Sequence, residues 1–456
     1  MDRKDITAEG LRVGIGFPSA VMLVIGGIIG VGIFVNPAVV ARGLTSPLLV
    51  LTAWALGGGI ALLGAFVSAE LAARMPNTGG EYVYLRDTFG PLAGFLFGWT
   101  TLLVVQAGGM AAVTIVFARN VNVLAGGALP ERVVVVATLA GLAGVNCLGV
   151  KSGNGVQGLL GALKVAAIAA VVLAGLFIAP QVGFKPAEVL ATVSADPLKA
   201  FGAAMIPVVF SYGGWQTANY VAGEIRDPSR NLARALLVGV IAVITIYLLV
   251  NIACVRALGV KQLGETLTPV SDVLQRATGP LGAGLAASAI ALSAIAYLSQ
   301  AMLTGPRVYF AMARDGLFFR QVARVGDNSR VPVISIVLQA VWTGFLALSG
   351  SYEQILSYVT SMNFLFFGLS ASCLFVLRRR DRAAGRKMDG YLAPFHPWST
   401  GAFVLACAVI VGVSFWAYPV NSLVGYGIML LGVPPYLYWR SQTPRDPTST
   451  EPVTLQ

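Results

Sequence analysis

The feature that most constrains this chain is a succession of about twelve apolar stretches, each of the length that a helix needs to cross a bilayer. They are Ile15–Ala41, Pro47–Ala72, Leu92–Phe117, Val133–Gly149, Val156–Phe177, Phe201–Val221, Ala235–Val255, Leu281–Ala311, Pro332–Ser349, Ile355–Val376, Ala402–Tyr418 and Leu423–Tyr438. Only 11% of the residues are charged, against about 25% in soluble domains, so lipid must cover much of the surface. We predict an all-α membrane protein in which residues 1–456 form a single transmembrane domain.

The Lys and Arg residues indicate how the chain is oriented. With a cytoplasmic N-terminus, most of the 31 basic residues fall in cytoplasmic loops, including the Arg-rich stretches 307–330 and 378–387. Cytoplasmic loops carry this excess of positive charge in membrane proteins. We therefore predict a multi-pass protein of the plasma (bacterial inner) membrane with both termini cytoplasmic. The net charge of +11 is explained by topology, so no nucleic-acid partner is expected.

Few residues are suited to catalysis or to metal binding. The chain has a single histidine, His396, and four separated cysteines without metal-ligand spacing: Cys147, Cys254, Cys373 and Cys407. An enzyme embedded in the membrane would need a cluster of such groups. We therefore predict no metal, no cofactor and no enzymatic activity.

Two of the apolar stretches contain glycine runs at corresponding places. The first stretch reads Gly-Gly-Ile-Ile-Gly-Val-Gly-Ile-Phe over Gly26–Phe34, and the sixth reads Phe-Ser-Tyr-Gly-Gly-Trp over Phe210–Trp215, just after Pro207. Glycine-interrupted segments at matching positions of two halves indicate the binding site of a transporter. The halves would be two five-helix repeats of opposite topology, at about 15–177 and 201–376, followed by two helices at about 402–438.

The first break predicts a site for a carboxylate. Broken helix is tolerated in a membrane only around a cavity, and Gly30 lets the chain unwind there. The half-helix that follows presents free N–H groups at a positive dipole end, so we expect Val31, Gly32 and Ile33 to bind a carboxylate. A glycine face that serves only close helix packing is the alternative explanation.

The second break predicts a site for an ammonium group. Carbonyl groups at the end of a half-helix attract a cation, so Ile29, Phe210 and Ser211 are the expected acceptors. Phe210 is also a candidate to close over a ligand side chain, although buried aromatic residues more often serve packing. Three further candidates leave room for the ligand or support the break: Gly213, Gly214 and Trp215.

Lys164 lies in the middle of an otherwise apolar segment, Val156–Phe177. A lysine at the centre of a membrane helix costs about 2.5–3.5 kcal/mol, so it must face acceptors inside the protein. A side chain that reaches the membrane surface is the alternative. The distance from both helix ends favours a functional lysine.

Together these motifs resemble the amino acid–polyamine–organocation superfamily, in particular its L-type amino acid transporters. The resemblance runs from Gly26 to about Arg380. Its anchors are the two glycine runs, Pro76–Tyr82 (Pro-Asn-Thr-Gly-Gly-Glu-Tyr), Glu224–Asn231 (Glu-Ile-Arg-Asp-Pro-Ser-Arg-Asn) and Arg307–Gly316 (Arg-Val-Tyr-Phe-Ala-Met-Ala-Arg-Asp-Gly).

The resemblance implies a LeuT-like fold with a five-plus-five inverted repeat and two further helices. It also implies sodium-independent transport in which Lys164 occupies the place of a sodium ion, with Ser293 as its nearest hydroxyl partner. Many such carriers have a small hydroxyl residue where this chain has Val31. The chain also lacks a cysteine in the loop Asn120–Arg132, where light-chain relatives bond to a second subunit, so no disulfide-linked partner is expected.

We therefore predict a sodium-independent carrier of neutral L-amino acids, acting as an exchanger or with protons. A carrier of polyamines or other cations is the first alternative, but it would need carboxylates within helices one, three, six, eight or ten, and none lies in the middle of these segments. A membrane sensor that does not transport is the second, and it would normally carry a soluble signalling domain. Uptake by liposomes that contain the purified protein would discriminate between these classes.

Overall fold

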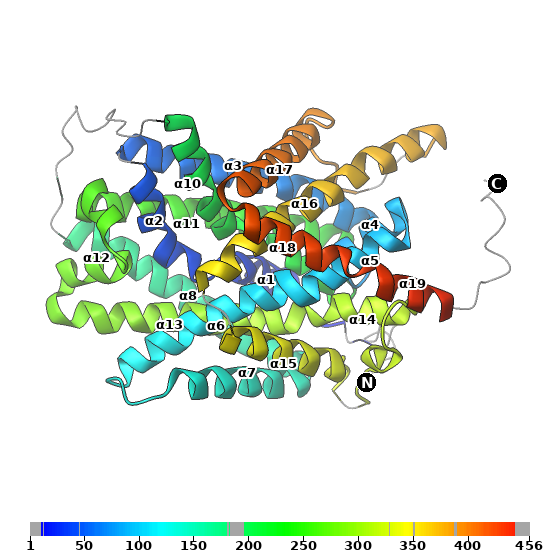
Figure 1. Cartoon of the computed structure of the whole chain (residues 1–456), viewed down its shortest axis with the longest axis horizontal. Helices are drawn as coiled ribbons and strands as arrows, with labels where there is room; N and C mark the ends of the chain where they lie inside the picture. The colour runs from blue at the N-terminus through cyan, green and yellow to red at the C-terminus, as the bar shows by residue number, and fades with distance from the viewer. Residues whose placement is uncertain are drawn as a thin grey trace.

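The computed structural model describes residues 11, 13–44, 46–179, 182, 196–327, 329–349, 352–386 and 390–442, which form a bundle of helices (Figure 1). The α-helices are α1 (Phe17–Ile28), α2 (Gly32–Gly43), α3 (Pro47–Arg74), α4 (Glu81–Phe89), α5 (Pro91–Thr100), α6 (Gln106–Leu124), α7 (Glu131–Cys147), α8 (Val150–Leu173), α10 (Pro197–Tyr212), α11 (Pro228–Glu265), α12 (Pro269–Thr278), α13 (Gly282–Thr304), α14 (Pro306–Arg314), α15 (Val333–Ser349), α16 (Tyr352–Ala383), α17 (Trp398–Ala417), α18 (Pro419–Leu430) and α19 (Val433–Gln442). Shorter π- or 3₁₀-helical segments are η2 (Thr101–Val105), η3 (Ala174–Ile178), η4 (Trp215–Glu224), η5 (Gly279–Leu281) and η6 (Arg320–Ala323).

The helices account for all twelve predicted segments. Within the described residues, nine stretches are long and apolar enough to cross a membrane. The other three segments are shorter or interrupted, and they correspond to α7, to α10 with η4, and to α15. The prediction of an all-α membrane protein with about twelve membrane helices is confirmed.

The first helix lies at the centre of the bundle. Figure 1 shows α1 in the middle of the view, and it contacts α8, α11, α13 and η4. Around it, α11 packs on α3 and α13 packs on α6. The C-terminal helices α17 and α18, orange to red in Figure 1, pack on α16. Any site formed by α1 is therefore enclosed by other helices.

Both glycine-containing segments are interrupted, as their sequences predict. The first helix ends at Ile28 and α2 begins at Gly32, so Ile29–Val31 lie outside regular helix. In the sixth segment α10 ends at Tyr212, and the 3₁₀-helical η4 begins after Gly213 and Gly214.

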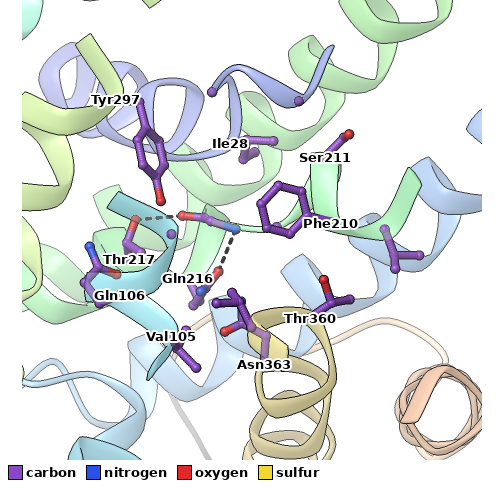
Figure 2. A pocket seen from close by; sticks show the side chains of 18 of the residues that line it. Ile28, Val105, Gln106, Phe210, Ser211, Gln216, Thr217, Tyr297, Thr360 and Asn363 are labelled. Carbon is purple, nitrogen blue, oxygen red and sulfur yellow. Dashed lines mark hydrogen bonds between the residues drawn. The ribbon is translucent and has the colours of Figure 1, made fainter. Parts of the chain in front are cut away.

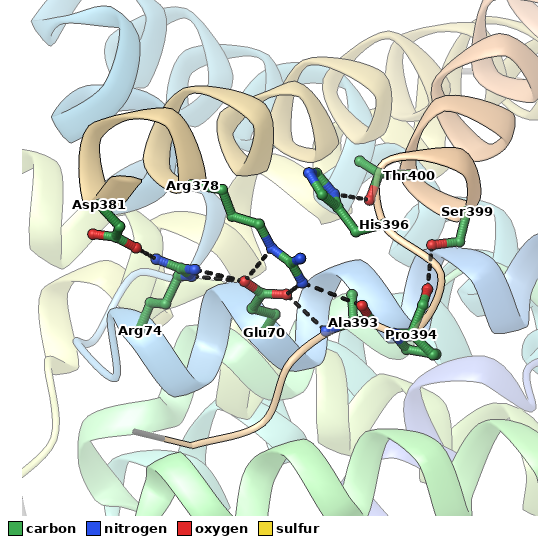
Figure 3. A network of polar contacts seen from close by, with 9 residues as sticks. All are labelled: Glu70, Arg74, Arg378, Asp381, Ala393, Pro394, His396, Ser399 and Thr400. Carbon is green, nitrogen blue, oxygen red and sulfur yellow. Dashed lines mark hydrogen bonds and ion pairs between the residues drawn. The ribbon is translucent and has the colours of Figure 1, made fainter. Parts of the chain in front are cut away.

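A network around Glu70 joins α3, α16 and the segment before α17 (Figure 3). The buried Glu70 carboxylate accepts hydrogen bonds from Arg74 at 2.7 Å, from Arg378 at 2.5 Å and from the Ala393 N–H at 2.7 Å. Arg74 also pairs with Asp381. This carboxylate is fully engaged in holding three parts of the chain together, which is a structural role.

A second buried ion pair joins η4 to α14. Glu224 and Arg307 are both 0% exposed, and their side chains are 2.7 Å apart. The Glu224 carbonyl also accepts from the N–H groups of Gly14 and Ile15 at 3.0 Å, and Arg226 N–H donates to the Ile15 carbonyl at 2.9 Å. The segment before α1 is thereby fixed to the end of η4.

Candidate functional site

The second break packs directly against the end of α1, just before the first break. Gly214 has φ +108°, and a Cβ added there would lie 2.1 Å from the Gly27 carbonyl oxygen, so both the backbone conformation and the space require glycine. The Gly214 N–H donates to the Gln216 side chain at 3.0 Å, and its carbonyl accepts from Thr217 at 2.7 Å (Figure 2). The unwound peptide is therefore held in one conformation.

A cavity of about 60 Å³ lies beside the breaks (Figure 2). A water molecule needs about 10–15 Å³ on this measure, so the cavity matches a small ligand. Its lining comes from both breaks, from the helix ends beside them, and from η2, α6, α13 and α16: Gly27, Ile28, Gly30, Val31, Gly32, Val105, Gln106, Gly109, Val113, Val209, Phe210, Ser211, Gly213, Gly214, Gln216, Thr217, Tyr297, Val359, Thr360, Asn363, Phe364 and Phe367.

The cavity brings together most of the predicted site residues, but not all of them. Seven line it: Gly30, Val31, Gly32, Phe210, Ser211, Gly213 and Gly214. Ile29, Ile33 and Trp215 do not belong to the lining. Trp215 is 4% exposed and packs with Phe367 at a centroid distance of 5.1 Å, so its ring belongs to the packing around the break.

The first break directs the start of α2 toward the cavity. Gly32 is the first residue of α2, and no side chain caps this helix. The initial N–H groups of a helix have no partner within it, and they carry the positive end of the dipole. Because Val31 and Gly32 line the cavity, this edge is suited to an anionic group.

The carbonyl groups of the first break are held by donors from two other helices. Lys164, on α8, is 0% exposed, and its ammonium donates to the carbonyls of Gly26, at 3.2 Å, and Ile29. The Ser293 hydroxyl, on α13, donates to the Gly30 carbonyl at 3.0 Å. Lys164 therefore does not extend to the membrane surface. The two residues act on neighbouring carbonyls of the same break.

Two residues that the sequence analysis did not identify connect the breaks. The Tyr247 hydroxyl, on α11, lies 3.1 Å from the Ile28 carbonyl and 3.0 Å from the Ser211 carbonyl. Asn36 donates to the Ser211 hydroxyl at 2.8 Å, and that hydroxyl donates to the Pro207 carbonyl at 2.8 Å. Asn36 was detectable as an amide within an apolar stretch, whereas nothing distinguishes Tyr247 from a packing tyrosine.

Several other residues around the cavity carry uncharged polar groups. Gln106, Tyr297, Thr360 and Asn363 line it (Figure 2). The sequence analysis missed these residues as well, although an amide in a membrane helix is a signal of function. Among the described residues of the lining there is no carboxylate, so the site lacks the group that an additional ligand cation would need.

The packed helices, the paired breaks and the cavity beside them define a membrane carrier with discontinuous helices. A model of the amino acid permease family matches residues 15–438. The chain belongs to this family.

Curated relatives match most of the chain. The large neutral amino acids transporter small subunit 2 of Homo sapiens is 29% identical over 94% of this chain and 81% of its own length. The serine/threonine exchanger SteT of Bacillus subtilis is 30% identical, over 85% of this chain and 89% of its own. The Asc-type amino acid transporter 1 of Mus musculus is 28% identical, over 95% and 82%. The resemblance to L-type transporters is thus confirmed, and the function is transport of amino acids across a membrane.

Proposed function

We propose that this protein carries small neutral L-amino acids by alternating access and without sodium. The observation that carries this proposal is the buried ammonium of Lys164 on the carbonyls of the first break. In carriers with discontinuous helices, unwound carbonyls coordinate the coupling cation. Here the protein itself supplies a positive charge at such carbonyls, so no metal cation is needed.

The substrate would bind as a zwitterion between the breaks. Its carboxylate would accept from the N–H groups of Val31, Gly32 and Ile33. Its ammonium would approach the carbonyls near Phe210 and Ser211, which have a second lone pair beside their present partners. The Ile29 carbonyl is taken by Lys164, so we assign it to the lysine rather than to the substrate.

The size of the cavity and the polar groups that line it favour a substrate with a small, uncharged side chain. The cavity measures about 60 Å³ and presents amide and hydroxyl groups but no described carboxylate. This favours neutral substrates over the cationic alternative. The names of the relatives, which include a neutral amino acid transporter and a serine/threonine exchanger, agree with this substrate class.

The test is uptake of radiolabelled amino acids by liposomes that contain the purified protein. Uptake should be equal when external sodium is replaced by choline, and amino acid methyl esters should compete poorly because they lack the carboxylate. Uptake driven by a sodium gradient would refute the role of Lys164. Equal competition by esters would refute the carboxylate site, and absence of any uptake would favour a sensor. An imposed pH gradient distinguishes proton-linked uptake from exchange.

The remaining organisation follows from the same proposal. The inverted repeats would span about 15–177 and 201–376, with about 402–438 as two additional helices. The protein would lie in the plasma membrane with both termini in the cytoplasm. It would act without catalysis and without a disulfide-linked subunit, since the loop Asn120–Arg132 has no cysteine.

A further inference from the structure

Glu81, the first residue of α4, is a buried carboxyl group without a basic partner. It is 1% exposed, and its Oε2 atom has no hydrogen-bond partner. The two other fully buried glutamates, Glu70 and Glu224, each pair with arginine. No ion pair joins Glu81 to a basic residue in the part of the chain described here. An unpaired carboxylate is costly to bury, so such a group is kept neutral.

The groups that face Glu81 are uncharged. Tyr220, on η4, forms a hydrogen bond with the Glu81 carboxyl group. Ser68 of α3 and Ser370 of α16 share a cavity of about 10 Å³ with it, and Tyr84 is one turn further along α4. The Ser370 hydroxyl and both polar side-chain atoms of the neighbouring Asn219 lack partners.

The charged groups of the surrounding helices have other partners. Arg86, on α4, pairs with Asp315, which follows α14, and with Asp87. Arg380, on α16, donates to the carbonyls of Asp87 and Thr88. The neighbouring α5 has no ionisable side chain, and the Cys373 thiol of α16 donates to the Tyr84 carbonyl. In the described part of the chain, none of these charged groups forms an ion pair with Glu81.

Glu81 lies between the candidate substrate cavity and a surface crevice. Its small cavity is bounded by Trp215 and Phe367, and Phe367 also lines the substrate cavity. On the other side Thr78, three residues before Glu81, lines a crevice of about 210 Å³ together with Arg86. A movement that separates η4 from the start of α4 would therefore open Glu81 to water.

Burial without a positive neighbour raises the pKa of Glu81 to about 8. Glu81 precedes the membrane stretch Pro91–Leu124 and follows Pro47–Arg74. In the conformation described here the carboxyl group therefore holds its proton at neutral pH. Exposed to water, its pKa would return to the ordinary value of about 4.3.

We propose that Glu81 is a proton-binding site that is loaded when this side of the carrier is closed and emptied when it opens. On opening, the carboxyl O–H bond breaks and the proton passes to water in the crevice; on closing, the carboxylate takes a proton back. This inference rests on the proposed alternating access, and it adds a pH-dependent step to it. The Arg-rich loops assign this side to the cytoplasm.

The sign of the pH dependence follows from the extra proton. Between the ordinary pKa and about 8 the closed state binds one more proton than the open state. Raising the pH through this window therefore disfavours the closed state by up to tenfold per pH unit. Glu81→Gln has the shape of the protonated acid and cannot lose a proton, so its closed state should not depend on pH in this way.

The experiment compares amide hydrogen exchange in wild type, Glu81→Gln and a control, Glu131→Gln, in liposomes. Glu131 is 48% exposed and lies 3.9 Å from Arg119. Peptides that cover 78–84 and 215–224 are followed from about pH 6 to about pH 7.5. Dividing the exchange rate of the variant by that of wild type at each pH cancels the chemical exchange rate.

As the pH rises, these peptides should lose protection from exchange in wild type and in Glu131→Gln. The loss should reach about tenfold per pH unit relative to Glu81→Gln. A constant ratio between wild type and Glu81→Gln would overturn the proposal. Protection that is higher in sodium than in choline, with this difference lost in Glu81→Gln, would indicate a metal-cation site instead of a proton site. A thermal-shift screen with amino acids tests the proposed function separately, because substrate binding stabilises the folded state whatever the role of Glu81.

Discussion

Replacement of Lys164 by alanine tests the central feature of the candidate site. The variant removes the donor to the Gly26 and Ile29 carbonyls. Each buried carbonyl left without a partner costs about 1–3 kcal/mol, or about 2–6 kcal/mol for the two. Removal of a charge from the middle of a membrane helix returns about 2.5–3.5 kcal/mol. The two effects nearly cancel, and alanine is the best helix former, so the variant should fold with little change in thermal stability.

Transport should nevertheless be lost. If the carbonyls of the break rearrange at a cost of even 1.4 kcal/mol, the rate falls about tenfold, and the estimate above allows a much larger loss. The assay is amino acid uptake by liposomes, with Lys261→Ala as the control, because Lys261 is an exposed lysine on α11. Normal uptake by a folded Lys164→Ala variant would refute the reasoning, as would an equal loss in Lys261→Ala.

Further variants test the neighbouring contacts. Gly214→Ala should reduce uptake of all substrates alike, because its Cβ would lie 2.1 Å from the Gly27 carbonyl oxygen. Gly30→Ala should exclude larger substrates first, because its Cβ would be 3.7 Å from Tyr297. Competition by amino acids of graded size distinguishes the two results. Tyr247→Phe leaves the Ile28 and Ser211 carbonyls without their shared donor. The variant should lower stability by about 1–3 kcal/mol and slow uptake. Unchanged thermal unfolding and unchanged uptake would contradict this. Glu224→Gln leaves Arg307 buried without its counter-charge and should cost about 3–5 kcal/mol, and a double-mutant cycle with Arg307→Met should recover part of that loss if the pair is the cause.

The geometry at Gly214 differs from the expectation that this glycine leaves room for a substrate. Glycine without a side chain suggests open space for a substrate, and Gly214 does line the cavity. Its missing Cβ, however, would point at the backbone of Gly27 rather than into the cavity. Size selection by a bulky residue at this position is therefore not expected, since the break itself would be displaced.

The sequence by itself determined the class of fold and the location of both breaks. Apolar length and glycine content are local properties, and the bilayer makes them decisive because unpaired backbone groups are not tolerated in lipid. The same argument identified Lys164, since a charge within an apolar helix must have a reason to be there.

Only the tertiary structure decided which groups meet. The contact of Gly27 with Gly214, the position of Tyr247 between the two breaks and the isolation of Glu81 all join segments far apart in the chain. They depend on how each helix is rotated about its axis and on how closely its neighbours approach. A hydrophobic period of 3.6 residues does not fix that rotation when a helix is apolar on every side. Glu70 shows both contributions: its partner Arg74 lies one turn along the same helix, whereas Arg378 reaches it only through packing, and packing leaves Glu81 without an arginine among the described residues.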